Sequence, residues 1–120
     1  TVESAYQDMT EYLDEDPYLP TAYFADNDII ASSCIRALED HGYSIPEDIS
    51  IVGFDDVSTS ALINPPLTTM AVPKVNMGAL AVRRLVDVIQ GNTGGEIVRI
   101  SVQPEIVQRK SVAPPPEDQT

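Results

Sequence analysis

The sequence has few of the residues that form covalent cross-links or nucleophile–base pairs. Its 120 residues include a single cysteine, Cys34, and a single histidine, His41. One cysteine cannot form an internal disulfide, which is typical of proteins in a reducing cytoplasm. Cys34 falls on the apolar side of a predicted helix, where a buried, unreactive thiol is expected. His41 falls at the end of that helix, where it is expected to cap carbonyls, so the sequence does not predict an enzyme.

Basic residues are also scarce. Seven Lys and Arg stand against nineteen Asp and Glu, which gives a net charge of −12. A phosphate backbone repels such a surface, and DNA-binding domains cluster their basic residues. Here they are scattered from Arg36 to Lys110. The charge therefore indicates that this chain does not itself contact nucleic acid.

Several motifs are missing. No apolar run is long enough to span a bilayer, and the first residues lack the basic start and apolar core of an export signal. No glycine-rich phosphate loop is present, because Gly94-Gly95 is typical of a turn. The acidic run 14–16 lacks the spacing and glycine of a calcium loop, so neither a metal nor a cofactor is expected. The adjacent carboxylates Asp55 and Asp56 would point apart on an extended chain, which disfavours a dyad sharing one proton.

Hydrophobic periodicity predicts an α/β fold. Apolar residues three and four apart predict helices over residues 2–13, 29–41 and 75–90. Apolar runs predict strands over residues 21–25, 49–54, 97–102 and 105–108, and a strand or connector over 67–71. Strand, helix and strand in this order form a right-handed βαβ unit, and the nearly continuous apolar run 49–54 suits a parallel sheet covered on both faces.

Two of the predicted strands end in polar side chains. These are Asp26, Asn27 and Asp28 after the first strand, and Asp55 and Asp56 after the second. Ligands of open α/β sheets bind beyond the carboxyl ends of the strands, so the two ends would converge on one cleft if the strands are neighbours. A carboxylate and a carboxamide there can bond to the hydroxyls of a small polar ligand.

Simpler roles for these polar residues remain open. Asp26 or Asn27 can cap the helix that follows, because a short side-chain oxygen accepts from first-turn amides. Asp56 can hold its own loop through an Asx turn. Spacing alone does not separate these roles from ligand binding by Asn27 and Asp55.

Five stretches in a fixed order carry a resemblance to a known family. They are Pro-Thr-Ala-Tyr-Phe-Ala-Asp-Asn-Asp-Ile-Ile-Ala (20–31), Ala-Leu-Glu-Asp-His-Gly-Tyr-Ser-Ile-Pro-Glu-Asp-Ile-Ser-Ile-Val-Gly-Phe-Asp-Asp (37–56), Pro-Pro-Leu-Thr-Thr (65–69), Met77-Gly78 with Ala81, and Pro-Glu-Ile-Val-Gln-Arg-Lys-Ser (104–111). Over almost the whole chain, this pattern resembles the LacI/GalR transcription regulators. One such stretch would be weak, whereas five in order are specific.

The resemblance implies a three-layer, parallel-sheet core of the periplasmic-binding-protein-like type I, in which two lobes close around an effector. By this match the core is incomplete. Residues 1–71 and 104–110 supply most of the C-terminal lobe, and residues 72–103 supply a crossover, one helix and one strand of the N-terminal lobe. One helix and one strand cannot build a core of their own, so their apolar stripe lacks its partners. An exposed patch of this kind tends to associate, and the helix is expected to pack on another copy or to fold back. The Pro-rich, polar residues 111–120 are expected to form a disordered tail.

The resemblance also assigns site residues. Asn27 and Asp55 match positions that bind the effector, and Asp55 is the stronger candidate. Val72 and Lys74 fall at the crossover beside the cleft, and both depart from the family. Val72 is apolar where some members place a polar contact, and Lys74 stands where a member has an aromatic wall. The family's main effector-binding arginine and a stacking aromatic would precede Thr1.

The family forms dimers, and the match implies a homodimer here. The matching dimer face consists of Ser32, Ser33 and Arg36 on a helix, and Thr59, Leu62 and Ile63 in a loop. The implied function is effector sensing in the cytoplasm, away from the membrane. A small polar ligand, a sugar or a nucleobase-like molecule, would control operator DNA binding by a headpiece absent from this chain.

A periplasmic or surface sugar-binding protein with the same core is the alternative function. Two features favour the regulator. One is the pair of stretches Pro-Pro-Leu-Thr-Thr and Gly-Phe-Asp-Asp, and the other is the missing export signal.

Overall fold

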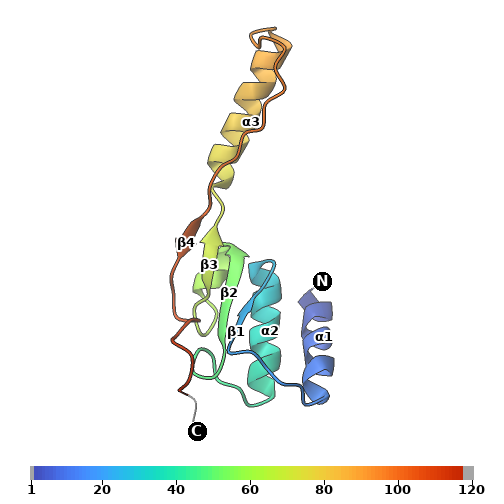
Figure 1. Cartoon of the computed structure of the whole chain (residues 1–120), viewed down its shortest axis with the longest axis vertical. Helices are drawn as coiled ribbons and strands as arrows, with labels where there is room; N and C mark the ends of the chain where they lie inside the picture. Colours follow the sequence, from blue (N-terminus) through green and yellow to red (C-terminus); the bar gives the residue numbers. More distant parts are fainter. Residues whose placement is uncertain (1, 118–120) are drawn as a thin grey trace. The chain divides into compact units, whose positions relative to one another are not determined.

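The computed structural model describes residues 2–117, and the chain divides into two compact units. Unit 1 comprises Thr1–Ala71 with Ile106–Thr120, and unit 2 comprises Val72–Glu105. The elements in chain order are α1 (Val2–Asp14), β1 (Ala22–Phe24), α2 (Asp28–Asp40), β2 (Ser50–Asp55), the 3-10 helix η1 (Ser58–Ala61), β3 (Thr68–Ala71), α3 (Lys74–Ile89) and β4 (Glu105–Val107) (Figure 1).

A mainly parallel sheet with helices packed beside it forms unit 1. The strand order is β1-β2-β3-β4, and both the β1–β2 and the β2–β3 pairs are parallel. α2 connects β1 to β2 and packs against β2, and α1 packs against α2 (Figure 1). The predicted α/β class is therefore confirmed, and these predicted elements lie within one residue of the observed bounds.

The core of unit 1 lies between α2 and the sheet. Its buried apolar side chains are Leu13, Ala25, Ala31, Ile35, Ala37, Leu38, Ile45, Ile49, Ile51 and Leu67. α2 ends in a Schellman motif, in which Tyr43 N donates to Leu38 O and Gly42 N donates to Glu39 O. Gly42 has φ +88°, a conformation that glycine adopts without the steric cost of a Cβ. The glycine therefore fixes where the chain leaves α2 towards β2.

His41 has the capping role that the sequence predicts. Its Nδ1 lies 2.7 Å from the carbonyl oxygen of Ala37, and its Nε2 lies 3.2 Å from Asp14 Oδ1. The bond to the Ala37 carbonyl, followed by the bond to Asp14, raises the pKa of His41 above its usual value. The imidazole thereby links the end of α2 to the end of α1.

The predicted disordered tail is wrong over its first three residues. Ser111 is fully buried, its carbonyl accepts from Ile51 N at 2.8 Å, and its hydroxyl donates to Ile51 O and accepts from Thr68 N. Ala113 exchanges two hydrogen bonds with the side chain of Ser50. These bonds hold residues 111–113 against the sheet. The prediction from composition therefore began the disordered tail too early. Residues 118–120 lie outside the described part of the chain.

Unit 2 consists of α3 and an extended segment that runs back along it (Figure 1). The strand predicted over 97–102 is wrong, because these residues do not form a strand. The strand of the N-terminal lobe that the resemblance implies, over 97–103, is absent for the same reason. A strand exists only through ladder bonds to a neighbouring strand, and α3 is the one regular element that lies wholly within this unit. No residue of α3 is buried, and Leu85, Val88, Ile89 and Ile97 are exposed, so these apolar side chains are not covered by other described residues. Among the described helices, none has the length and hydropathy needed to cross a membrane.

Candidate ligand-binding site

The carboxyl ends of β1 and β2 present polar side chains at one edge of the sheet. The two strands are adjacent and parallel, with Phe24 opposite Val52, so the residues that follow them emerge side by side. Asn27 and Asp55 are both half-buried, whereas Asp26 is exposed. The topology therefore brings the two residues that were expected to bind ligand to one edge of one unit.

Asn27 is the N-cap of α2. Its backbone is extended, with φ −155° and ψ 169°, and its Oδ1 accepts from Ile30 N at 2.9 Å. The side-chain amide is the group of Asn27 that can donate to a ligand, because its oxygen is already used in the cap. Capping and ligand binding, which the sequence leaves as alternatives, are thus compatible in this residue.

The loop after β2 has an uncommon backbone. Asp55 has φ 112° and Asp56 has φ 50°, and both lie in the region that favours glycine. Residues held there cost about 1–3 kcal/mol each and persist only where their surroundings enforce the conformation. Such backbone strain clusters at ligand-binding sites, which supports a role for this loop beyond connecting two elements.

Arg109 holds the second of these aspartates. Its Nη2 donates to Asp56 Oδ1 at 2.6 Å, and its Nη1 donates to the carbonyl of Leu67 at 2.9 Å. Both side chains of this ion pair are largely buried. Asp56 therefore bonds to a distant segment and does more than hold its own loop. Sequence analysis missed Arg109, since a lone arginine followed by Lys110 is typical of a solvated charge.

Asp28 was named only as part of the polar run 26–28, and sequence analysis missed its buried role. It is 1% exposed and lies in the first turn of α2. Its Oδ2 accepts from Val57 N at 3.0 Å and from Ser60 Oγ at 2.5 Å, while its Oδ1 accepts from Thr69 Oγ1 at 2.5 Å. One buried carboxylate thus joins α2, the loop after β2, η1 and β3. We call Asp28, Val57, Ser60 and Thr69 the Asp28 cluster.

The crossover residues lie in the other unit. Val72 is half-buried, and its carbonyl accepts from Lys74 N at 2.7 Å. Lys74 is exposed and begins α3. Both belong to Val72–Glu105, so the structure does not bring them into the same unit as Asn27 and Asp55.

The residues expected at a dimer face lie at two places in unit 1. Ser32, Ser33 and Arg36 line a cavity of about 620 Å³ between α2 and α1, together with Glu3, Tyr6 and Gln7. Leu62 is 82% exposed and Thr59 is exposed, whereas Ile63 packs against the core. Ser33 does not fit an exposed face, because it is buried and its hydroxyl donates to Ile29 O.

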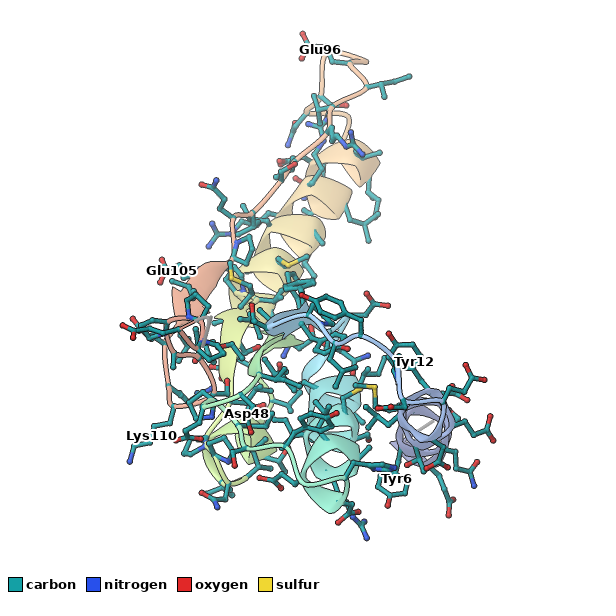
Figure 2. The ribbon with its side chains drawn as sticks, turned by 60° about the horizontal axis from the view of Figure 1, so that its bottom comes forward. Tyr6, Tyr12, Asp48, Glu96, Glu105 and Lys110 are labelled. Carbon is teal, nitrogen blue, oxygen red and sulfur yellow. The ribbon has the colours of Figure 1, made fainter. Side chains whose placement is uncertain are left out.

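Tyr6, a residue of α1, is one of the residues that line that cavity, and Figure 2 shows it beside α1 and α2. The Arg36 guanidinium lies 5.1 Å from the centre of the Tyr6 ring, and Tyr6 Oη donates to Asp40 Oδ2 at 2.7 Å. The bond to Asp40 raises the pKa of Tyr6. These contacts fix Arg36 on the surface where α1 and α2 meet.

Cys34 lies against apolar groups, and its burial raises the pKa of its thiol. Cys34 is half-buried, whereas a fully buried thiol was expected, and its raised pKa favours the protonated form, which is the weaker nucleophile. Within residues 2–117, no group of His, Cys, Asp and Glu side chains is arranged to hold a metal ion.

The chain matches a family of known sequences and several named proteins. Residues 1–112 match the model of the family described as periplasmic binding protein-like domain. Over 112 residues the chain is 40% identical to the HTH-type transcriptional repressor PurR of Haemophilus influenzae (strain PittEE), covering 92% of this chain and 33% of that protein. It is 37% identical over 114 residues to the PurR repressor of Escherichia coli O139:H28, covering 95% of this chain and 33% of that protein. The chain thus spans 33% of the length of these curated relatives.

Solved structures show the same fold. A complex of the transcriptional regulator CelR with cellobiose superposes with a TM-score of 0.83 at 35% identity, covering 92% of this chain and 33% of that one. The Lac repressor bound to ONPG superposes with a TM-score of 0.82 at 32% identity, covering 93% of this chain and 33% of that one. A LacI family regulator from Enterococcus faecium with bound ribose gives 0.79 at 36% identity, covering 95% and 41%.

Proposed function

We propose that this chain, which belongs to the periplasmic binding protein-like family, senses a small polar ligand for a transcription regulator. It is the C-terminal half of a LacI/GalR effector-binding domain. In this proposal unit 1 is most of the C-terminal lobe, and residues 72–103 belong to the N-terminal lobe. The ligand binds between the lobes, and a headpiece upstream of this chain binds operator DNA in the cytoplasm. Ligand binding controls the headpiece only through different affinities for two lobe arrangements.

The observation that supports this proposal is the placement of Asn27 and Asp55 at the ends of adjacent parallel strands. The Asp55 carboxylate accepts hydrogen bonds, and the Asn27 amide donates them. That pair suits neighbouring hydroxyls of a sugar, each of which donates and accepts. Structural relatives are described with bound cellobiose, lactose or ribose, which supports a sugar as the ligand class, with a nucleobase as the other candidate.

The test is a ligand screen on the full-length protein that contains this chain. Sugars and nucleobases are screened by thermal shift, and the affinity of a hit is then measured by calorimetry. Asp55→Asn is expected to weaken binding roughly 30-fold, since a hydrogen bond to a charged group contributes about 2 kcal/mol. Asparagine also tolerates positive φ, so the loop should persist.

The matched control is Glu47→Gln, which neutralises an exposed carboxylate in the turn before β2. It should bind the hit as the unaltered protein does. If Asp55→Asn binds equally well, Asp55 is not a ligand residue. A nucleobase as the hit would replace the sugar assignment.

We also propose that the exposed loop at Leu62 forms part of a homodimer face. Leu62→Asp should weaken dimerisation by about 2 kcal/mol, because a carboxylate would replace an apolar contact at the interface. Analytical ultracentrifugation of the full-length protein would show a dimer dissociating at roughly 30-fold higher concentration. Tyr18→Asp, at a side chain that is 96% exposed elsewhere in unit 1, is the control and should remain dimeric. If the two variants dissociate at the same concentration, Leu62 is not part of the dimer interface.

A further inference from the structure

The loop that contains Asp55 needs support from outside its own residues. Asp55 and Asp56 both have positive φ, which disfavours their side chains whatever the sequence around them. Two anchors follow immediately: Asp56 pairs with Arg109, and Val57 N donates to Asp28 Oδ2 at 3.0 Å. The Val57 bond lies two residues from Asp55 and is made from the interior of the protein.

The interior anchor is itself fixed. Ser60 Oγ binds the same oxygen of Asp28, and Thr69 Oγ1 binds the other oxygen, so the carboxylate cannot rotate without losing a bond. Asp28 directly follows Asn27, the N-cap whose oxygen is bonded to Ile30 N. Asn27 and the loop of Asp55 are therefore tied to each other through one rigid turn of α2.

We propose that Asp28 is a positioning residue that sets the distance between Asn27 and Asp55 without touching the ligand. This inference rests on the proposed function and adds a residue to it. A buried aspartate that only stabilised the core would affect folding and leave the affinity of the folded protein unchanged. A positioning residue also changes affinity, because misplacing a binding group weakens it even when the group itself is present.

Asp28→Ala tests the proposal in the full-length protein. It should weaken ligand affinity about tenfold in the folded fraction and accelerate amide hydrogen exchange at Val57 about tenfold, as expected when a protecting hydrogen bond is lost. Asp28→Asn should restore both. Its carboxamide oxygen can accept from Val57 N and Ser60 Oγ, and its NH2 can donate to the Thr69 hydroxyl.

The control is Ser111→Ala, which removes another buried hydrogen-bonding side chain of unit 1. The hydroxyl of Ser111 bonds to the backbones of Ile51 and Thr68, which lie outside the loop of residues 55–57. This variant should lose stability while its ligand affinity and its Val57 exchange stay unchanged. Equal loss of affinity in Ser111→Ala and Asp28→Ala would overturn the positioning role.

If Asp28→Ala does not fold, Thr69→Val tests the positioning role of Asp28. It keeps the volume of the side chain and removes one bond from the carboxylate, so affinity should fall about threefold and Val57 should exchange faster. Unchanged exchange and affinity in Thr69→Val would refute the proposal. So would an Asp28→Asn variant as weak as Asp28→Ala, because the charge of Asp28 and not its position would then be responsible.

The exchange measurement separates this proposal from the proposed function. If no sugar or nucleobase binds even the unaltered protein, the proposed function fails. Faster Val57 exchange in Asp28→Ala but not in Ser111→Ala would still show that Asp28 holds the loop. Slow exchange in every variant would show the opposite, whether or not a ligand is found.

Discussion

Alanine in place of Gly53 should lower the free energy of unfolding by about 3 kcal/mol, because overpacking a fixed core costs 1–3 kcal/mol and the hydrogen bonds of the Asp28 cluster would be broken as well. A Cβ on Gly53 would overlap Asp28 Oδ1 and lie 2.9 Å from Leu67 Cδ2 and 3.3 Å from Asp28 Cα. The carboxylate cannot yield, since it is held by Val57, Ser60 and Thr69. Leu67 is fully buried, so its side chain cannot move out into solvent.

Urea denaturation measures this effect, and Gly78→Ala is its control. A Cβ on Gly78 would meet no heavy atom within 4 Å, and the residue lies in α3. Alanine there should leave stability unchanged or raise it by about 0.5–1 kcal/mol, the usual gain over glycine in a helix. A Gly53→Ala protein as stable as the unaltered one would mean that the Asp28 cluster can relax, and would weaken the case for Asp28 as a rigid anchor.

Local patterns predicted most elements of unit 1 because periodicity is a local property. The apolar spacing in α2 and the apolar run of β2 each depend on a short window of sequence. The segment 97–102 has an equally good strand pattern, yet it forms no strand. Whether a strand forms depends on a second segment, and no pattern inside the window can supply that neighbour.

The positions of the two candidate binding residues were predicted better than those of the residues that support them. Asn27 comes three residues after the end of β1, and Asp55 is the last residue of β2, so their place at a strand end was predictable. Asp28 stands in the polar run 26–28, which is typical of a solvated loop, and nothing in its own window distinguishes it from Asp26. One signal was available elsewhere: Gly53 interrupts the apolar run 49–54, where a glycine indicates close approach of another group.

Composition predicted disorder for residues 111–120 because prolines and charges dominate that stretch. It could not identify Ser111, whose hydroxyl and carbonyl form hydrogen bonds with backbone groups of β2 and β3. Backbone groups inside a sheet need partners, and a single serine can provide several of them. The anchoring of this segment depends on contacts between residues some sixty positions apart, which composition does not encode.

Ending the chain after Lys110 should therefore destabilise unit 1 by about 5 kcal/mol, at about 1 kcal/mol for each of the five hydrogen bonds that are lost. The truncation removes the bonds of Ser111 to Ile51 and Thr68, and those of Ala113 to Ser50. It leaves the amides of Ile51 and Thr68 without these acceptors, in residues that are almost fully buried. Urea denaturation should show a lower midpoint with a similar slope.

Ending the chain after Ala113 is the matched truncation. It removes the Pro-rich residues 114–117, which are exposed, together with 118–120, and it keeps every bond of Ser111 and Ala113. Stability should then stay within about 0.5 kcal/mol of the full chain, as for surface changes away from packed groups. A large loss of stability in this truncated chain would show that residues after 113 also anchor the segment. A small loss after Lys110 would show that the sheet tolerates the missing acceptors, so that the segment only rests on a sheet that is already stable. The expected contrast instead makes residues 111–113 part of the frame that holds β2 within the sheet.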